Sequence, residues 1–325
     1  MKFIDMHCDT LALAASRGET TMYELTNSML DVRRLKAAGA LAQFFAVFFP
    51  PREAFGRMGI GAADDAEYFA RCHSVFTATL KEHSDVIKPA YNAGDIGDNE
   101  AAGAVSALLT FEDGRAIDGK LENLAHYHDL GVRLISLTWN GENCFGWPNS
   151  PDPELMARGL KPFGVEAVYE MNRLGMIIDV SHLSDGGFWD VSRHSEKPFV
   201  ASHSNARALS PHRRNLTDDM IRALAERGGV VGVNYYPLFL NADASPSPAT
   251  AELAARHVVH IIKAGGEDTA ALGSDWDGFK EETELDGPQK TELLFAALRS
   301  AGISERLIEK VAWTNALRVL GDVLG

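Results

Sequence analysis

Eight short apolar segments recur along the chain and are separated by longer amphipathic stretches. Short, nearly continuous apolar runs are typical of strands in a parallel sheet that is buried on both faces. The runs are residues 3–6, 41–48, 104–111, 132–138, 176–180, 199–202, 230–233 and 270–273. Helical periodicity is clear between them at 218–227 and 304–320, where apolar residues share one stripe. Eight strand–helix repeats predict a single α/β domain over residues 1–325, a closed (β/α)8 TIM barrel.

Several classes of protein are disfavoured by the sequence. A net charge of -14 argues against nucleic-acid binding, which needs a concentrated basic face. The phosphate-binding motif G-x-x-x-x-G-K-[ST] is not found, and no G-x-G-x-x-G opens a helix after a predicted strand. Nucleotide-binding α/β folds are therefore disfavoured. The N-terminus lacks the apolar stretch of a signal peptide, no run approaches the ~18 apolar residues of a membrane span, and the three cysteines are scattered. We therefore expect a cytoplasmic protein without nucleic-acid or membrane partners.

Three connections are longer than a turn requires. They are residues 50–61, 140–162 and 235–249, and each follows the carboxyl end of a predicted strand. Long loops in compact domains are usually functional or disordered. Barrel enzymes keep their active sites on this face of the barrel. The sequence therefore predicts that the functional site lies at the carboxyl ends of the strands.

Histidine and carboxylate side chains stand where several predicted strands end. His7 and Asp9 end the first strand, and alternation along a strand points them the same way. Glu112, His182 and His203 follow the third, fifth and sixth strands. Each alone has an ordinary structural interpretation, as a helix-leading acid or a hydrogen-bonded core histidine. In a closed barrel, however, these strand ends converge on one mouth.

This set of side chains suits divalent cations. Imidazole nitrogens and carboxylate oxygens are typical ligands of zinc. Five ligands exceed the need of one tetrahedral catalytic zinc, whereas two ions roughly 3.5 Å apart, bridged by a carboxylate, would use them all. We therefore predict two divalent metal ions, with zinc as the preferred metal. Asp275, after the eighth strand, lies at the same end, and Asp277 can be confused with it.

Other candidate groups have weaker support. The pairs His257 with His260 and His126 with His128 lie on predicted helices, where surface or packing roles are expected. No G-x-S-x-G motif precedes a helix, so catalysis by a nucleophilic serine is disfavoured.

The chain resembles the membrane dipeptidase (renal dipeptidase) family of zinc peptidases over nearly its whole length. The resemblance rests on HCDTL at 7–11, FEDG at 111–114, LGVRL at 130–134, DVSH at 179–182, SHSN at 202–205, RRN at 213–215 and GSDWDG at 273–278. Members of this family hydrolyse dipeptides, often with a D-residue at the C-terminal position, and commonly form homodimers. The resemblance implies a soluble bacterial-type member, because the chain lacks the secretory features of the mammalian enzymes.

The resemblance also implies a role for each motif residue. His7 and Asp9 would hold one zinc ion and Glu112 would bridge it to the other. The second ion would be held by His182 and His203. Asp275 would be the catalytic acid and base, and Arg214 would meet the carboxylate of the substrate.

One position departs from the family pattern. Family members often carry a histidine after the fourth strand that polarises the substrate carbonyl, and this chain has Trp139 there. Asn140 or Asn143 could supply a hydrogen-bond donor instead, and Trp139 could equally be a packing residue at the mouth. Two alternatives stay open at this point: a barrel hydrolase of another amide, a lactone or a phosphoester, and a non-catalytic metal-binding barrel. Hydrolases of the former kind often carry H-x-H on the first strand and a modified lysine on the fourth, and both are missing here.

Overall fold

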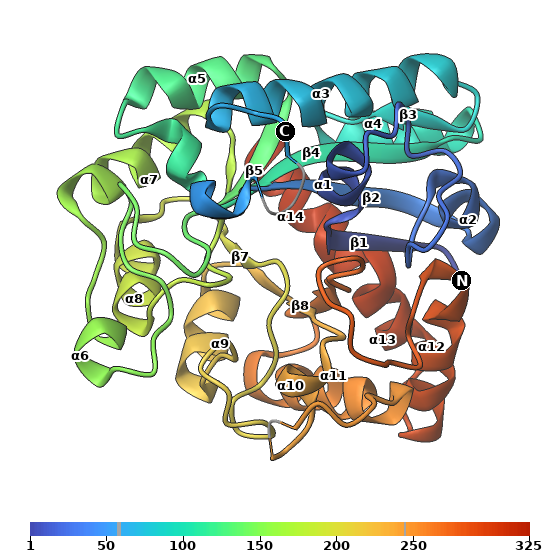
Figure 1. Cartoon of the computed structure of the whole chain (residues 1–325). Coiled ribbons are helices and arrows are strands. Elements are labelled where there is room, and N and C mark those ends of the chain that lie inside the picture. Colours follow the sequence, from blue (N-terminus) through green and yellow to red (C-terminus); the bar gives the residue numbers. More distant parts are fainter. Residues whose placement is uncertain (57–59, 244) are drawn as a thin grey trace.

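Eight parallel strands close into a barrel in the computed structural model, which describes residues 1–56, 60–243 and 245–325 (Figure 1). The order around the barrel follows the chain, and closure comes from β1, which pairs with both β2 and β9. The barrel strands are β1 (Phe3–Cys8), β2 (Ala40–Phe48), β4 (Val105–Glu112), β5 (Val132–Ser136), β6 (Ile177–Asp179), β7 (Val200–Ala201), β8 (Val230–Val233) and β9 (Ala270–Leu272). The predicted (β/α)8 fold is therefore confirmed.

A ninth strand, β3 (Ile87–Pro89), lies outside the barrel. It pairs with the beginning of β4, where Ile87 lies opposite Val105. This strand was not predicted because it has three residues, one of them a lysine and one a proline, and so forms no apolar run. The eight predicted strands all exist, with ends that differ from the prediction by at most two residues.

Helices surround the barrel, and many begin at a side-chain cap. Asp31, Asp64, Asn92, Ser184 and Thr217 each accept a hydrogen bond from the backbone N–H three residues later, which satisfies a group that the first turn leaves unpaired. The helices are α1 (Thr10–Ser16), α2 (Val32–Ala38), α3 (Asp65–Glu82), α4 (Ala93–Ala101), α5 (Leu121–Asp129), α6 (Pro153–Met156), α7 (Pro162–Leu174), α8 (Asp185–His194), α9 (Asp218–Glu226), α10 (Pro237–Leu240), α11 (Ala251–Gly265), α12 (Thr291–Ser300), α13 (Glu305–Glu309) and α14 (Asn315–Leu324).

The predicted helix 304–320 is longer than expected and not uniform. A π-helical turn, Lys310–Thr314, separates α13 from α14, and α14 continues to Leu324. The helical stripe seen in the sequence is real, but its period cannot reveal one inserted wide turn. After this turn, α14 packs Val319 and Leu320 against the barrel.

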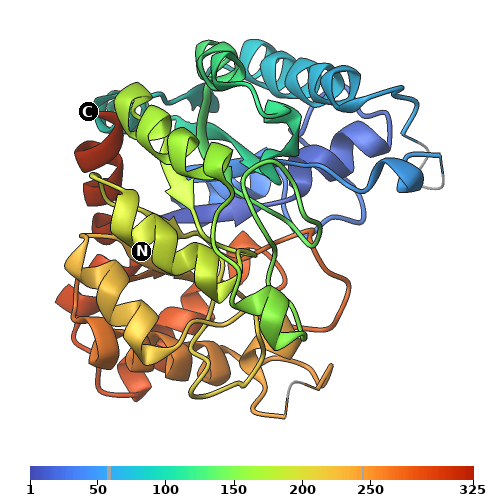
Figure 2. The ribbon, with the colours of Figure 1, turned by 90° about the vertical axis from the view of Figure 1, so that its left-hand side faces the viewer.

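The interior of the barrel is filled by apolar side chains and closed at one end by α14. Ile4, Phe44 and Leu108 pack there with Val319 and Leu320 of α14. A second, larger apolar cluster lies between the strands and the outer helices. Figure 2 shows α14 at one end of the molecule and the long loops at the opposite end. The end that carries the loops, at the carboxyl ends of the strands, is therefore the one open to a ligand.

The three long loops follow β2, β5 and β8, as predicted, although residues 57–59 and 244 within two of them lie outside the described residues. The loop after β5 contains the short helix α6, and the loop after β8 contains the short helix α10. The first loop is fixed by an ion-pair cluster in which buried Asp65 contacts Arg52 at 2.6 Å and Arg115 at 2.8 Å. In the described part of the chain, we find no helix that combines the length and the apolar character needed to cross a membrane.

Candidate metal centre

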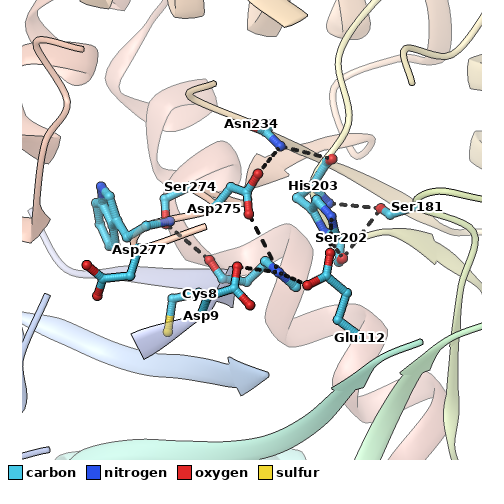
Figure 3. A network of polar contacts seen from close by, with 12 residues as sticks. Cys8, Asp9, Glu112, Ser181, Ser202, His203, Asn234, Ser274, Asp275 and Asp277 are labelled. Carbon is cyan, nitrogen blue, oxygen red and sulfur yellow. Dashed lines mark hydrogen bonds and ion pairs between the residues drawn. The ribbon is translucent and has the colours of Figure 1, made fainter. Parts of the chain in front are cut away.

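Polar side chains from five strand ends meet at the open end of the barrel. Figure 3 shows Asp9, Glu112, His203 and Asp275 of this group. His7 lies in β1 and Asp9 follows it, while Glu112 is the last residue of β4. His182 and His203 come shortly after β6 and β7. Asp275 follows β9 in the same way. The structure therefore brings together all five predicted metal ligands and the predicted catalytic carboxylate.

Glu112 lies between the three histidines. Its Oε1 is 2.9 Å from Nε2 of His182 and 3.6 Å from Nε2 of His203, and its Oε2 is 3.7 Å from Nε2 of His7. The Nε2 atoms of His182 and His203 are 3.0 Å apart. Such an arrangement fits a carboxylate that two metal ions share.

His7 joins this group to a second group of carboxylates. Its Nε2 is 3.6 Å from Oδ2 of Asp9 and 3.7 Å from Oδ1 of Asp275. Ligand atoms of His7, Glu112 and His203 all lie within 4.8 Å of one another, and so do those of His7, Asp9 and Asp275. The geometry thus offers two adjoining sets of ligand atoms with His7 in both.

The hydrogen bonding of these groups fits a cation better than a protein partner. Both ring nitrogens of His7 and Oδ1 of Asp9 are buried without a hydrogen-bond partner among the described residues. A buried polar atom without a partner costs about 1–3 kcal/mol, and metal coordination removes that cost. In His182 and His203 the Nδ1 atom contacts another side chain, Asn140 and Ser202 respectively, which leaves each Nε2 facing Glu112. Imidazole and carboxylate ligands of this kind fit zinc.

Burial dominates the electrostatics of the site. It raises the pKa of Glu112 to about 8, and the charge of Asp9 adds to the shift. Burial also raises the pKa of Asp275 to about 7, partly offset by His7. The same desolvation holds the pKa of His182 and His203 well below the ordinary value. His7 differs, because burial lowers its pKa but its contacts with Asp9 and Glu112 outweigh this effect and raise the pKa well above the ordinary value. Carboxyl groups pushed toward neutrality beside the neutral imidazoles of His182 and His203 form a cluster that a bound cation stabilises.

Unusual backbone conformations gather at this site. His182, Asp275 and Asp277 have φ values of 70°, 64° and 69°, and Asp113, next to Glu112, has 80°. Residues other than glycine rarely adopt the left-handed region, and such strain is common at functional sites. The strain turns His182 and Asp275 toward the cluster just after their strands end.

β1 departs from regular alternation as it enters the site. Ile4 and Met6 pack inside the barrel, whereas Cys8 packs outside it. A register shift between Asp5 and Cys8 in the pairing with β2 accounts for this change of face. With this irregularity, His7 and Asp9 face the same cluster. Regular alternation along the strand predicted the same orientation, but this part of β1 does not alternate regularly.

A cavity of about 630 Å³ opens beside the cluster. Asp9, Glu112, His182 and Asp275 contribute to its wall, together with six aromatic and several small or polar residues. The aromatic side chains are Phe48, Tyr68, Trp139, Tyr236, Phe239 and Phe279. This volume is sufficient for a small molecule with apolar side chains.

The structure separates the two asparagines that the sequence left as alternatives. The amide group of Asn143 donates to Asp113 and to the carbonyl of Leu137, both at 2.7 Å. Asn140 is exposed, lines the cavity, and uses its Oδ1 for the contact with His182 at 3.1 Å. The amide N–H groups of Asn140 therefore remain available to a bound molecule, while those of Asn143 serve the fold.

Trp139 is half-buried in the cavity wall. Its ring contacts Phe48 edge to face at 4.9 Å between centroids and lies 6.2 Å from the ring of His182. The residue thus both packs at the mouth and borders the cavity beside the cluster, so packing and ligand contact are compatible roles.

Arg214 is buried directly behind His203. Its guanidinium donates to the carbonyl of His203 and to Ser204, both at 3.3 Å, and stacks over Phe239 at 5.2 Å. Its Nε has no partner among the described residues. Burial lowers the pKa of Arg214 to about 10, so the group stays positively charged at neutral pH. A buried cation with spare N–H groups suits an anionic part of a ligand.

Asn234 is a site residue that was not predicted from the sequence. It follows β8 directly, is fully buried, and donates from Nδ2 to Oδ2 of Asp275 at 2.8 Å. The rule that found the histidines, a polar residue at the carboxyl end of a barrel strand, applies to Asn234 as well. An amide was overlooked because it is neither a common metal ligand nor an acid.

The helical histidines have structural contacts, as expected. His257 is buried and lies between the backbone of Ala206 and Leu240, and His260 forms an ion pair with Asp218 at 2.7 Å. Neither side chain is part of the cluster at the barrel mouth.

Known proteins share this sequence and architecture. The family model described as "Membrane dipeptidase (Peptidase family M19)" matches residues 1–324. An uncharacterised Klebsiella pneumoniae protein encoded in the pqqA 5' region is 39% identical over 241 residues, which are 71% of this chain and 87% of that one. The dipeptidase aclJ of Aspergillus oryzae is 32% identical over 94% of this chain and 73% of its own length.

A solved structure agrees with these relatives. The metallopeptidase of Rhodobacter sphaeroides, liganded with a phosphinate mimic of the dipeptide L-Ala-D-Ala, superposes with a TM-score of 0.87 at 28% identity and covers 99% of both chains. With the family matched over nearly the whole length, this chain belongs to the membrane dipeptidase family, peptidase family M19, and is a metal-dependent dipeptidase.

Proposed function

We propose that the chain hydrolyses the peptide bond of short dipeptides with two zinc ions at the barrel mouth. His7 and Asp9 would hold one ion, His182 and His203 would hold the other, and Glu112 would lie between them. The observation that carries this proposal is the convergence of three imidazole Nε2 atoms on the two oxygens of Glu112. Two such ions, when bound, would lower the pKa of a water molecule that serves as the nucleophile and would polarise the scissile carbonyl.

The residues of the chain supply proton transfer and orientation. Asp275 takes the proton of the attacking water and returns it to the departing amine, and Asn234 holds its carboxylate in place. Asn140 donates an N–H to the substrate carbonyl, in the place where family members often have a histidine. Trp139 and Phe48 form an apolar wall for a side chain of the dipeptide. Arg214 binds the terminal carboxylate and so restricts the enzyme to short substrates.

The C-terminal residue of the substrate is proposed to be accepted in the D or the L form. The support is indirect: the similar Rhodobacter sphaeroides enzyme binds a mimic of L-Ala-D-Ala. Homodimer formation and cytoplasmic location are further proposals, which gel filtration and cell fractionation test.

A panel of dipeptides tests the proposed function. We expect the purified, zinc-loaded protein to cleave L-Xaa-L-Xaa and L-Xaa-D-Xaa dipeptides with a free carboxylate, and to cleave their C-terminal amides much more slowly, because Arg214 then has no anion to bind. Release of amino acids, followed by amine derivatisation, is the measurement. Cleavage of lactones or phosphoesters in preference to every dipeptide would support the other hydrolase class, and two bound metals without any turnover would support a binding role.

Replacement of Arg214 by lysine tests the carboxylate contact. A hydrogen bond to a charged group contributes about 1.5–3 kcal/mol, so loss of the planar guanidinium should raise KM for free dipeptides by roughly 10- to 100-fold. The neighbouring Arg213 is exposed, and Arg213→Lys is the matched control with KM close to that of the parent. If Arg214→Lys changed KM no more than the control does, Arg214 would not be the carboxylate-binding group.

A further inference from the structure

A chain of fully buried hydrogen bonds lies behind His203. Asp179, at the end of β6, accepts backbone N–H bonds from Ser181 at 2.9 Å and Ser202 at 2.8 Å on its Oδ1. Its Oδ2 accepts from the hydroxyl of Ser202 at 2.6 Å and from that of Ser136. Asp179 thus ties β5, β6 and β7 together beneath the metal centre, with four donors and no water-exposed surface.

Counting protons along this chain determines the tautomer of His203. The two backbone N–H groups can only donate to Asp179, and an ionised carboxylate, which has no proton to donate, accepts from the two hydroxyls as well. The single hydroxyl proton of Ser202 is directed to Asp179, and its oxygen can therefore only accept in the contact of 2.8 Å with Nδ1 of His203. His203 must carry its proton on Nδ1, which leaves the lone pair on Nε2, the nitrogen that faces Glu112 and His182.

The other histidines of the cluster are held less firmly. Nδ1 of His182 contacts Oδ1 of Asn140, whose side chain is exposed at the mouth of the cavity. Neither ring nitrogen of His7 has a hydrogen-bond partner among the described residues. Of the three histidines, His203 is the one whose ring is linked to a buried carboxylate, through Ser202 to Asp179. We call this link the Asp179–Ser202 relay.

We propose that the Asp179–Ser202 relay is a positioning device that fixes His203 as an Nε2 ligand and sets the affinity of the metal ion held by His182 and His203. The part of this proposal that concerns the metal rests on the proposed function. Groups that hydrogen-bond to the outer nitrogen of a metal-binding histidine fix its tautomer and orientation, and their loss typically lowers metal affinity about 10- to 100-fold.

The tautomer is measured directly in the metal-free protein. Long-range ¹H–¹⁵N correlation spectra of histidine-labelled protein distinguish Nδ1–H from Nε2–H, and the signals of His203 are identified by their loss in His203→Gln. We expect the Nδ1–H form in the parent and a mixed or Nε2–H form in Ser202→Ala. A predominant Nε2–H form in the parent overturns the proposal, even if the variant does not fold.

Metal titration then tests the consequence. Ser136→Ala is the matched control, because Ser136 is equally buried and bonds to Asp179 but does not contact His203. We expect Ser202→Ala to weaken one of the two zinc-binding steps by about 10- to 100-fold, and Ser136→Ala to change both by a few-fold at most. Equal effects of the two variants refute the relay. Neither experiment needs a substrate, so a protein without dipeptidase activity could still show the expected tautomer of His203. Failure of the relay proposal can therefore be told apart from failure of the proposed dipeptidase function.

Discussion

Replacing Asp275 by asparagine is expected to lower kcat on dipeptides by about 10²- to 10⁴-fold, the usual contribution of a general base, while both metals stay bound. The amide cannot accept the proton of the attacking water. Asn234 donates to Oδ2 of Asp275, so the new amide would turn its oxygen toward Asn234 and its NH2 group toward the metal centre. Steady-state kinetics and metal analysis of the same preparation are the measurements.

Asp277 provides the control for this substitution. It lies two residues further on, is also a carboxylate with positive φ, and lines the same cavity. Its oxygens, however, accept from Thr10 and from the backbone N–H of Met29, both at 2.6 Å. We expect Asp277→Asn to keep most of the turnover. If Asp275→Asn had the same kcat as the parent, Asp275 would not be the general base. If the variant lost a metal ion, Asp275 would instead be one of the metal ligands.

The substitution Gly273→Ala is expected to destabilise the barrel by about 3 kcal/mol or more, because overpacking against backbone cannot relax by a rotamer change. A Cβ atom at Gly273 would lie 1.8 Å from the carbonyl oxygen of Ser202, and one at Gly232 would lie 2.0 Å from the same atom. Real Cβ contacts are essentially never below 3.0 Å. The strands β7, β8 and β9 would have to separate just below His203.

Thermal unfolding measures this effect, with a decrease in Tm of at least about 5 °C as the expected result. Gly97→Ala is the control: Gly97 lies in α4, and a Cβ atom added there would have nothing within 4 Å, so alanine should be neutral or slightly stabilising. Equal Tm values for the two variants would show that the barrel tolerates separation of these strands.

Local sequence features were sufficient to predict the strands and the side chains that gather at the barrel mouth. The eight apolar runs all became barrel strands, because a buried parallel strand needs an unbroken apolar run and leaves that mark in the sequence. His7, Glu112, His182 and His203 were found because barrel topology forces strand ends together. β3 was missed because it is an edge strand of three residues whose pairing with β4 carries no such pattern.

The hydrogen bonds of the supporting groups could not be predicted from the sequence. Asn140 and Asn143 differ only in their neighbours, and hydrogen bonds to Asp113 and Leu137 reserve Asn143 for the fold. Asn234 and Ser202 gain their positions from partners far along the chain, Asp275 and Asp179. Contacts of this kind depend on the packing of strands that are separated by tens of residues, and a single sequence holds no record of them.

Local patterns combined with closed-barrel topology were enough to predict the barrel, the end at which it is open, and the types of side chain that meet there. The tertiary structure alone decided how these groups act together: the distances around Glu112, the positive φ of His182 and Asp275, and the buried relay to His203. The physical reason is that tautomer, orientation and proton affinity depend on burial and hydrogen-bond partners in three dimensions, which only the assembled barrel provides.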